Sequence, residues 1–243
     1  MAGHSKWANI KHRKGAQDAK RGKLFTKIAK EVTVAAKLGG DDPDGNPRLR
    51  AAIVKARGVS MPKDNIDRAI KRGAGGQDMA DYFEKVYEGY GPGGVAVMVE
   101  CLTDNINRTV SEVRHAFSRA GGNLGTDGSV SWMFHKKGTI VYTKDKIEDF
   151  DSFFEAALEA GADDVKDEGE VYEIECSPNA FSDLKEALDK LNIEADVAEV
   201  GLVPENWSEL DAGKAASLHK LVDILEDNDD VQNVSHNGQF PEE

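Results

Sequence analysis

The sequence has little of what builds disulfide-linked or metal-binding proteins. Its only cysteines, Cys101 and Cys176, lie in apolar, strand-like runs. Cysteines in such runs are typically buried and reduced, so we expect neither a disulfide nor a catalytic thiol. The six histidines are scattered along the chain without the spacing of zinc ligands. We therefore assign no metal site and no cofactor.

Long hydrophobic segments are also missing. The longest apolar run covers residues 95–99 and is far too short to span a bilayer. The first seven residues lack the apolar core of a signal peptide. We therefore expect a cytoplasmic protein that has no membrane partner.

Catalytic motifs are absent as well. The sequence contains no nucleophile elbow, no P-loop and no zinc signature. Neighbouring carboxylates such as Asp163 and Asp164 lie where a strand is expected, so they point to opposite faces and cannot act as an acid–base pair. The glycine-rich residues 89–94 precede a strand instead of joining a strand to a helix, which excludes a dinucleotide loop. The sequence indicates a protein without enzymatic activity and without an evident small-molecule substrate.

Charge is abundant but strongly segregated. Residues 1–75 carry 18 Lys and Arg against 7 Asp and Glu, whereas residues 76–243 carry 13 against 37. The net charge of −13 therefore hides a basic N-terminal part and an acidic remainder. A basic block of this size is typical of a module that binds a polyanion, which the acidic remainder would repel.

The basic part is predicted to be helical. Residues 1–16 show no periodicity, and we expect a mobile arm that becomes ordered with its partner. From residue 18 to residue 38, apolar side chains recur at three- and four-residue steps and lysines gather on the opposite face. Asn46-Pro47 and Pro62 open two further helices, which end at Gly58 and Gly73. These elements predict a basic helical domain over residues 1–76.

Strand-like and helical runs alternate in the remainder, which predicts an α+β fold. A strand over 93–102, a helix over 105–120 and a short strand over 129–134 come first. Residues 138–203 then follow the order βαββαβ of a ferredoxin-like unit. A helix over 212–226 and a strand over 231–236 are expected to return to the first sheet. The predicted architecture is thus an N-terminal three-helix domain followed by two α/β domains, 77–137 plus 204–243 and the acidic insertion 138–203.

The basic arm and the lysine face of the first helix are the candidate nucleic-acid-binding site. Cations can neutralise phosphates, and the interleaved rings can stack on an unpaired base. A solvated charged face is the structural alternative. The candidate residues are Lys6, Trp7, Lys11, His12, Arg13, Lys14, Lys20, Arg21, Lys23, Lys27 and Lys30.

Two other segments have a functional interpretation and a structural one. The turn at 58–61 has the length found in a helix-turn-helix motif, but acidic residues near the end that would face DNA favour a plain helical hairpin. The polar segment 103–109 lies at a strand-to-helix junction and could contact a phosphate. Helix capping explains the same residues without a ligand, and we favour capping.

Several long strings resemble the YebC/PmpR family. They include MAGHSKWANIKHRKGAQDAKRGK at the N-terminus, NPRLR, MPKDNI, EGYGPGG and TDNINRT, and the resemblance covers essentially the whole chain. It implies a helical domain followed by two α/β domains and a cytoplasmic, probable transcriptional regulator that binds DNA. The family has no generally accepted set of catalytic residues.

The resemblance also implies a second function. The family is related to the mitochondrial translational activator of cytochrome c oxidase, which acts with the ribosome and helps synthesis through proline-containing stretches. Three hypotheses follow: a DNA-binding transcriptional regulator, a ribosome-associated translation factor that binds rRNA or tRNA, and a protein-interaction module that binds no nucleic acid. Binding to duplex DNA requires a helix that reads a groove, whereas binding to the ribosome requires only an arm that folds on RNA.

Overall fold

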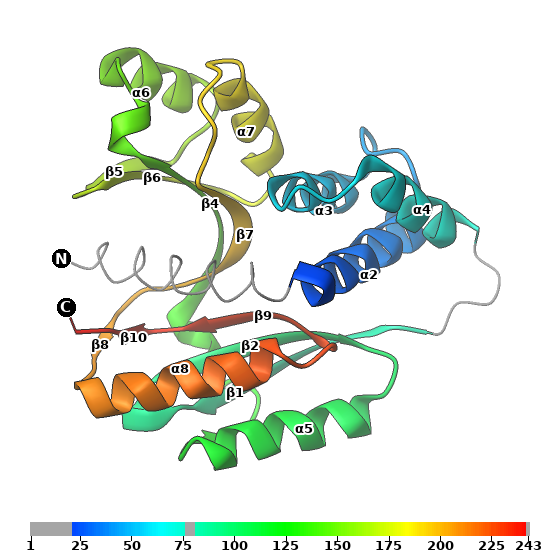
Figure 1. The fold of residues 1–243 in the computed structure, drawn as a ribbon, viewed down its shortest axis with the longest axis vertical. Helices are drawn as coiled ribbons and strands as arrows, with labels where there is room; N and C mark the ends of the chain where they lie inside the picture. The colour runs from blue at the N-terminus through cyan, green and yellow to red at the C-terminus, as the bar shows by residue number, and fades with distance from the viewer. Residues whose placement is uncertain (1–20, 76–80, 242–243) are drawn as a thin grey trace.

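The computed structural model describes residues 21–75 and 81–241 of the 243-residue chain. The N-terminal arm expected over residues 1–16 lies outside this range. Within it, the chain forms a helical part and two parts in which helices pack on antiparallel sheets (Figure 1).

The helical part contains α2 (Arg21–Gly39), α3 (Pro47–Gly58) and α4 (Lys63–Ala74). Its core includes Ile28, Val32 and Leu49, which are buried by the periodic apolar faces of the helices. Asn46 caps α3, since its side-chain oxygen accepts a hydrogen bond from the backbone N–H of Leu49 at 3.0 Å. Gly73 lets α4 approach α2, because a Cβ there would lie 2.2 Å from the Thr33 carbonyl oxygen.

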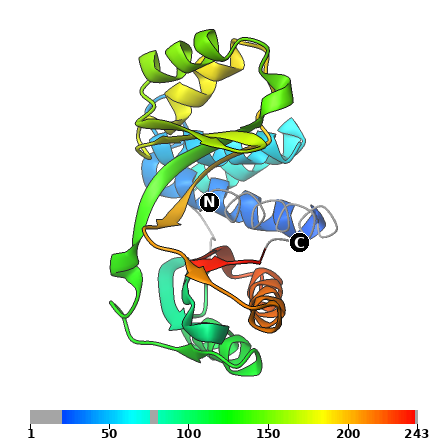
Figure 2. The same cartoon turned by 90° about the vertical axis from the view of Figure 1, so that its left-hand side faces the viewer.

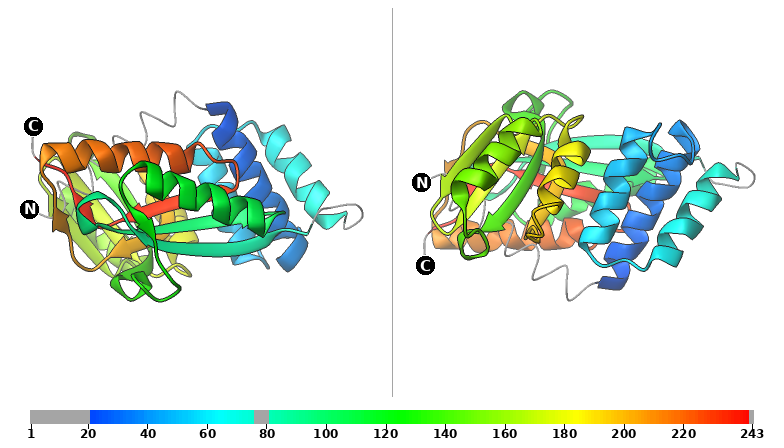
Figure 3. Two further views of the ribbon diagram at one scale, coloured as in Figure 1. Left: turned by 90° about the horizontal axis from the view of Figure 1, so that it is seen from below. Right: turned by 90° about the horizontal axis from the view of Figure 1, so that it is seen from above.

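The first sheet has the strand order β3-β1-β2-β9. Its strands are β1 (Phe83–Tyr90), β2 (Ala96–Thr103), β3 (Asn123–Leu124) and β9 (Val231–His236). Two helices, α5 (Ile106–Arg119) and α8 (Ala212–Glu226), cover one face of the sheet (Figure 3, left). Alternate residues of β2 point toward these helices and form the core with Phe117 and Leu221. The strand β9 therefore pairs with β2, which precedes it by more than 120 residues.

The second sheet has the order β5-β6-β4-β7, with all neighbours antiparallel. It contains β4 (Phe134–Thr143), β5 (Asp164–Glu168), β6 (Val171–Cys176) and β7 (Val197–Pro204). The helices α6 (Phe150–Glu159) and α7 (Phe181–Asp189) pack on one face. This is the strand order of a ferredoxin-like unit. The strands β8 (Ser208–Glu209) and β10 (Gly238–Gln239) form a separate, short parallel pair. The sequence pattern predicts neither of these two strands.

The predicted α+β class is confirmed, with helices first and two α/β parts after them. Two local expectations are wrong or incomplete. Residues 129–134 do not form a strand, because the Glu88 carboxylate binds the backbone N–H groups that a strand would use, and β4 begins only at Phe134. The sequence pattern predicts no strand over residues 83–90, where the structure has β1.

The helical part contacts both sheets. In Figure 1, α2 lies beside β9, and α3 reaches toward α7 and β7. Figure 3 (right) shows α3 next to α7 when the molecule is seen from above. The two α/β parts and the helices thus meet around α3.

Candidate nucleic-acid interface

Most residues of the predicted binding site lie outside the described part of the chain. These residues are Lys6, Trp7, Lys11, His12, Arg13, Lys14 and Lys20. Arg21 opens α2, but its side chain is likewise outside the description. The structure places the remaining three, Lys23, Lys27 and Lys30, on one face of α2.

This lysine face contacts the acidic turn between α8 and β9, residues 226–230. The Lys23 ammonium lies 2.9 Å from Oδ1 of Asp227. Lys27 donates a hydrogen bond to the backbone carbonyl of Glu226. Lys30 donates to the Asp229 carbonyl at 3.0 Å and lies 3.4 Å from Oδ1 of Asp230. In this structure the three lysines already bind oxygen atoms of their own chain.

Lys27 is the most deeply engaged of the three. Its residue is only 8% exposed, and burial lowers the pKa of its ammonium group to about 8, although the acidic groups of the turn act in the opposite direction. A buried cation that is bound to a carbonyl cannot reach a phosphate unless α2 leaves the turn. Its role as a phosphate contact therefore stays a prediction that requires this exchange.

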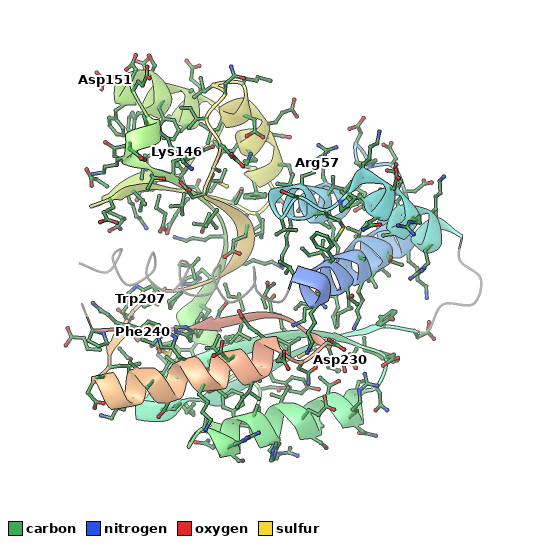
Figure 4. The ribbon with its side chains drawn as sticks, in the orientation of Figure 1. Arg57, Lys146, Asp151, Trp207, Asp230 and Phe240 are labelled. Atoms are coloured by element: carbon green, nitrogen blue, oxygen red, sulfur yellow. The ribbon has the colours of Figure 1, made fainter. Side chains whose placement is uncertain are left out.

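Asp230 is the last residue of the acidic turn and is labelled in Figure 4. Its Oδ2 accepts hydrogen bonds from Thr109 at 2.9 Å and from Arg108 Nη2 at 2.6 Å. Thr103 donates to the same oxygen at 3.2 Å. Burial alone would raise the pKa of this carboxyl group, but the hydrogen bonds and the charge of Lys30 hold it below its usual range. The carboxylate thus joins α2, α5 and β2.

The same contacts explain the polar segment 103–109. Asn105 caps α5, because its side-chain oxygen accepts the backbone N–H of Arg108 at 3.0 Å. The Arg108 guanidinium binds Asp104 and Asp230. The capping interpretation is confirmed, and Arg108 has an internal partner in place of a phosphate.

Other basic residues of the helices also pair with the α/β part. Arg48 on α3 binds Glu31 at 2.8 Å and also Glu84 on β1. Lys55 donates to the side chain of Asn233 on β9 at 3.1 Å. Some of the basic residues of the helices therefore hold the helical part against the acidic α/β part. Sequence reasoning missed this interface, although the complementary charges were its signal.

Unengaged cations lie elsewhere on the helices. Arg57, Lys63, Lys71 and Arg72 are exposed and form no hydrogen bond or ion pair with the described residues. Arg57 is labelled in Figure 4, at the end of α3 near α7. Arg68 binds the side-chain oxygen of Asn65 in the first turn of α4, the helix that follows the turn at 58–61. The exposed cations extend the basic surface beyond the lysine face.

Two clefts of about 530 and 500 Å³ lie on either side of α3. Both are lined by Lys55, Glu199 and Asn233, and they hold mixed charges. Among the described residues, no group of three or more His, Cys, Asp or Glu side chains could hold a metal ion. No helix in that part of the chain is long and apolar enough to cross a membrane.

Comparisons with known proteins give a consistent result. Residues 5–76 match the model of the TACO1/YebC protein N-terminal domain, and residues 82–238 match that of the TACO1/YebC second and third domain. The chain is 60% identical over 237 residues to a probable transcriptional regulatory protein of Geobacter sulfurreducens, covering 98% of this chain and 95% of that protein. It is 56% identical over 245 residues to the probable transcriptional regulatory protein YebC of Shigella boydii, covering 100% and 98%.

A solved structure is also similar. The crystal structure of a conserved hypothetical protein, Aq1575 from Aquifex aeolicus, superposes with a TM-score of 0.80. The two sequences are 46% identical, and the alignment covers 93% of each chain.

Proposed function

The chain belongs to the TACO1/YebC family, and from this premise we propose that it is a non-enzymatic regulator that binds nucleic acid through its basic N-terminal region. The relatives named as probable transcriptional regulatory proteins support the regulatory role. The target that we propose first is duplex DNA, and structured RNA is the alternative.

The charge distribution is the observation that carries this proposal. Residues 1–75 have a net charge of +11, and residues 76–243 have a net charge of −24. A polyanion is attracted by the first part and repelled by the second, so it is directed to the N-terminal residues. The contacts of the lysine face with the acidic turn limit which cations are available to a phosphate. Lys27 and Lys30 hold the acidic turn. We infer that a phosphate first meets the cations before α2 and the exposed Arg57, Lys63, Lys71 and Arg72.

A specific observation favours RNA as the alternative target. The helix α4 has an engaged Asn65 and exposed acids at Asp64 and Asp67, which is a poor surface for reading bases in a major groove. A phosphate-binding segment without a groove-reading helix suits structured RNA, including that of the ribosome. Transcriptional regulation through DNA follows instead from the names of the relatives.

Binding to matched probes tests the choice. We expect the full chain to bind either a 20-base-pair DNA duplex or an RNA hairpin of equal charge more tightly by at least about tenfold, measured by fluorescence anisotropy at one salt concentration. Co-sedimentation with ribosomes from lysate indicates the RNA alternative, and preference for the duplex indicates DNA. Absence of binding to both probes at low salt would leave only the protein-interaction module and would contradict the proposal.

A further inference from the structure

The acidic turn that holds the lysine face offers the same chemistry as a polyanion. All residues of the turn, 226–230, are acidic except Asn228. Carboxylates and backbone carbonyls of the turn bind all three ammonium groups of the lysine face. A phosphate backbone offers lysines the same kind of partner, an oxygen atom that carries negative charge. The turn and a nucleic acid therefore require the same three cations.

The turn keeps its shape through contacts that do not involve α2. The Asn228 side chain donates a hydrogen bond to Glu112 on α5 at 2.6 Å. Its side-chain oxygen accepts the backbone N–H of Asp230 at 2.8 Å. The Asp230 carboxylate is in turn bound by Arg108 and Thr109, also on α5. These contacts hold the oxygens of the turn at fixed positions, with or without α2 beside it.

The contact between α2 and the first α/β part is polar. The core of the helical part is formed by residues between 24 and 70, and the core of the first sheet by residues between 87 and 240. Among the described residues, neither core includes a side chain of the other part. Figure 2 shows where the two parts meet, with α2 in blue above the red strand β9. Such an interface can open without exposing either core, so α2 can leave the turn while both parts stay folded.

Lys27 shows that the turn is an imperfect partner for the lysine face. Its ammonium group is buried and donates to the backbone carbonyl of Glu226, which carries no formal charge. A phosphate oxygen supplies the opposite charge that this carbonyl lacks, and charged partners form the stronger hydrogen bonds. The turn still competes well with a phosphate, because it belongs to the same chain and its effective concentration at α2 is high.

We propose that the acidic turn is an autoinhibitory contact that competes with nucleic acid for Lys23, Lys27 and Lys30. This inference rests on the proposed function and adds a regulation of the same site. With the turn in place, a polyanion meets only the other cations of the N-terminal region. When α2 leaves the turn, three further ammonium groups become available along about 10 Å of one helix face.

Neutralising the exposed part of the turn tests the inference. Asp227→Asn combined with Asp229→Asn removes two exposed charges and leaves the buried Asp230 in place. In the full chain, we expect this turn variant to bind the 20-base-pair DNA duplex about fivefold to tenfold more tightly than the parent, measured by fluorescence anisotropy. The slope of log affinity against log salt should steepen by roughly 2, at about 0.9 for each added phosphate contact. Because both side chains are exposed, the variant keeps the melting temperature of the parent.

Two further variants separate the turn from a general effect of charge. Asp163→Asn combined with Asp164→Asn removes the same charge from two neighbouring exposed acids at the start of β5. This matched control should bind the duplex within about twofold of the parent. Lys27→Met added to the turn variant should remove roughly one unit of the gained slope, because it removes one of the released cations. The same substitution in the parent changes nothing, since the turn still covers that position.

The outcomes distinguish this inference from the proposed function. If the parent binds the duplex and the turn variant gains no more affinity than the control, the turn is not a competitor. The autoinhibitory contact is then refuted and the proposed function stands. If neither the parent nor the turn variant binds the duplex or the RNA hairpin at low salt, both are refuted.

Discussion

Replacing Asp230 by alanine is expected to destabilise the protein by about 3–5 kcal/mol. The carboxylate is 5% exposed and is bound by Arg108, Thr103 and Thr109, with Lys30 at 3.4 Å. Its loss removes an acceptor from the buried Thr103 and Thr109 hydroxyls and an ion partner from Arg108 and Lys30, and with them the centre of the contact between α2, α5 and β2. Urea unfolding of the purified chain measures the free energy.

Asp229→Ala is the matched control. Asp229 is the neighbouring residue and is exposed, and only its backbone carbonyl binds Lys30. We expect a change within about 0.5 kcal/mol, as for most surface substitutions. Equal effects of the two substitutions would show that the carboxylate of Asp230 does not hold the interface.

Lowering the pH distinguishes the loss of the interactions of the Asp230 carboxylate from a simple loss of packing. The pKa of Asp230 is lowered in the folded protein, so the folded state favours the ionised form. Its contribution is fully present above the unfolded value of about 3.9 and is lost as pH falls through the lower folded value. The difference between the parent and Asp230→Ala in free energy of unfolding should therefore shrink below about pH 4.

Replacing Glu88 by alanine is expected to cost about 3 kcal/mol or more. Three backbone N–H groups lose their acceptor, and each unsatisfied buried donor costs about 1–3 kcal/mol unless water reaches it. Hydrogen exchange adds a local measurement, because the amides of Val130 and Ser131 should lose their protection. Glu88→Gln keeps one acceptor oxygen and should give an intermediate loss.

Lys85→Ala on the same strand is the control for Glu88. Its side chain is exposed and makes no hydrogen bond or ion pair with a described residue. We expect no change in stability or in amide protection of the loop. Protection that survives in Glu88→Ala would contradict the role of the carboxylate in holding residues 128–131.

The elements with strong local patterns could be predicted from the sequence. The helix over 212–226 and the strand over 231–236 have the predicted bounds. Apolar residues recur at helical spacing along the helix, and Asp211 caps its start. The helices of the N-terminal part follow the same signals, with Asn46 and Pro47 at the start of α3. Local periodicity was sufficient wherever one face of the element is buried.

Features that depend on distant residues could not be predicted. The strand β1 exposes Phe83 and Val86, so its alternation is weak and its pairing with β2 decides its structure. The loop at 123–133 depends on Glu88, about 40 residues earlier in the chain. The lysine face meets a turn about 200 residues away, and no local pattern states which acids it will contact.

The salt dependence of nucleic-acid binding tests the central claim most directly. For the full chain, neutralisation of about six phosphates on duplex DNA predicts a slope of roughly −5 for log affinity against log salt. Removal of residues 1–20, which carry Lys6, Lys11, Arg13, Lys14 and Lys20, should flatten the slope toward roughly −1. Lys27→Met should leave it unchanged, because that ammonium is buried against the Glu226 carbonyl. Equal slopes for the full and shortened chains would contradict the claim that the basic N-terminal region binds the phosphates.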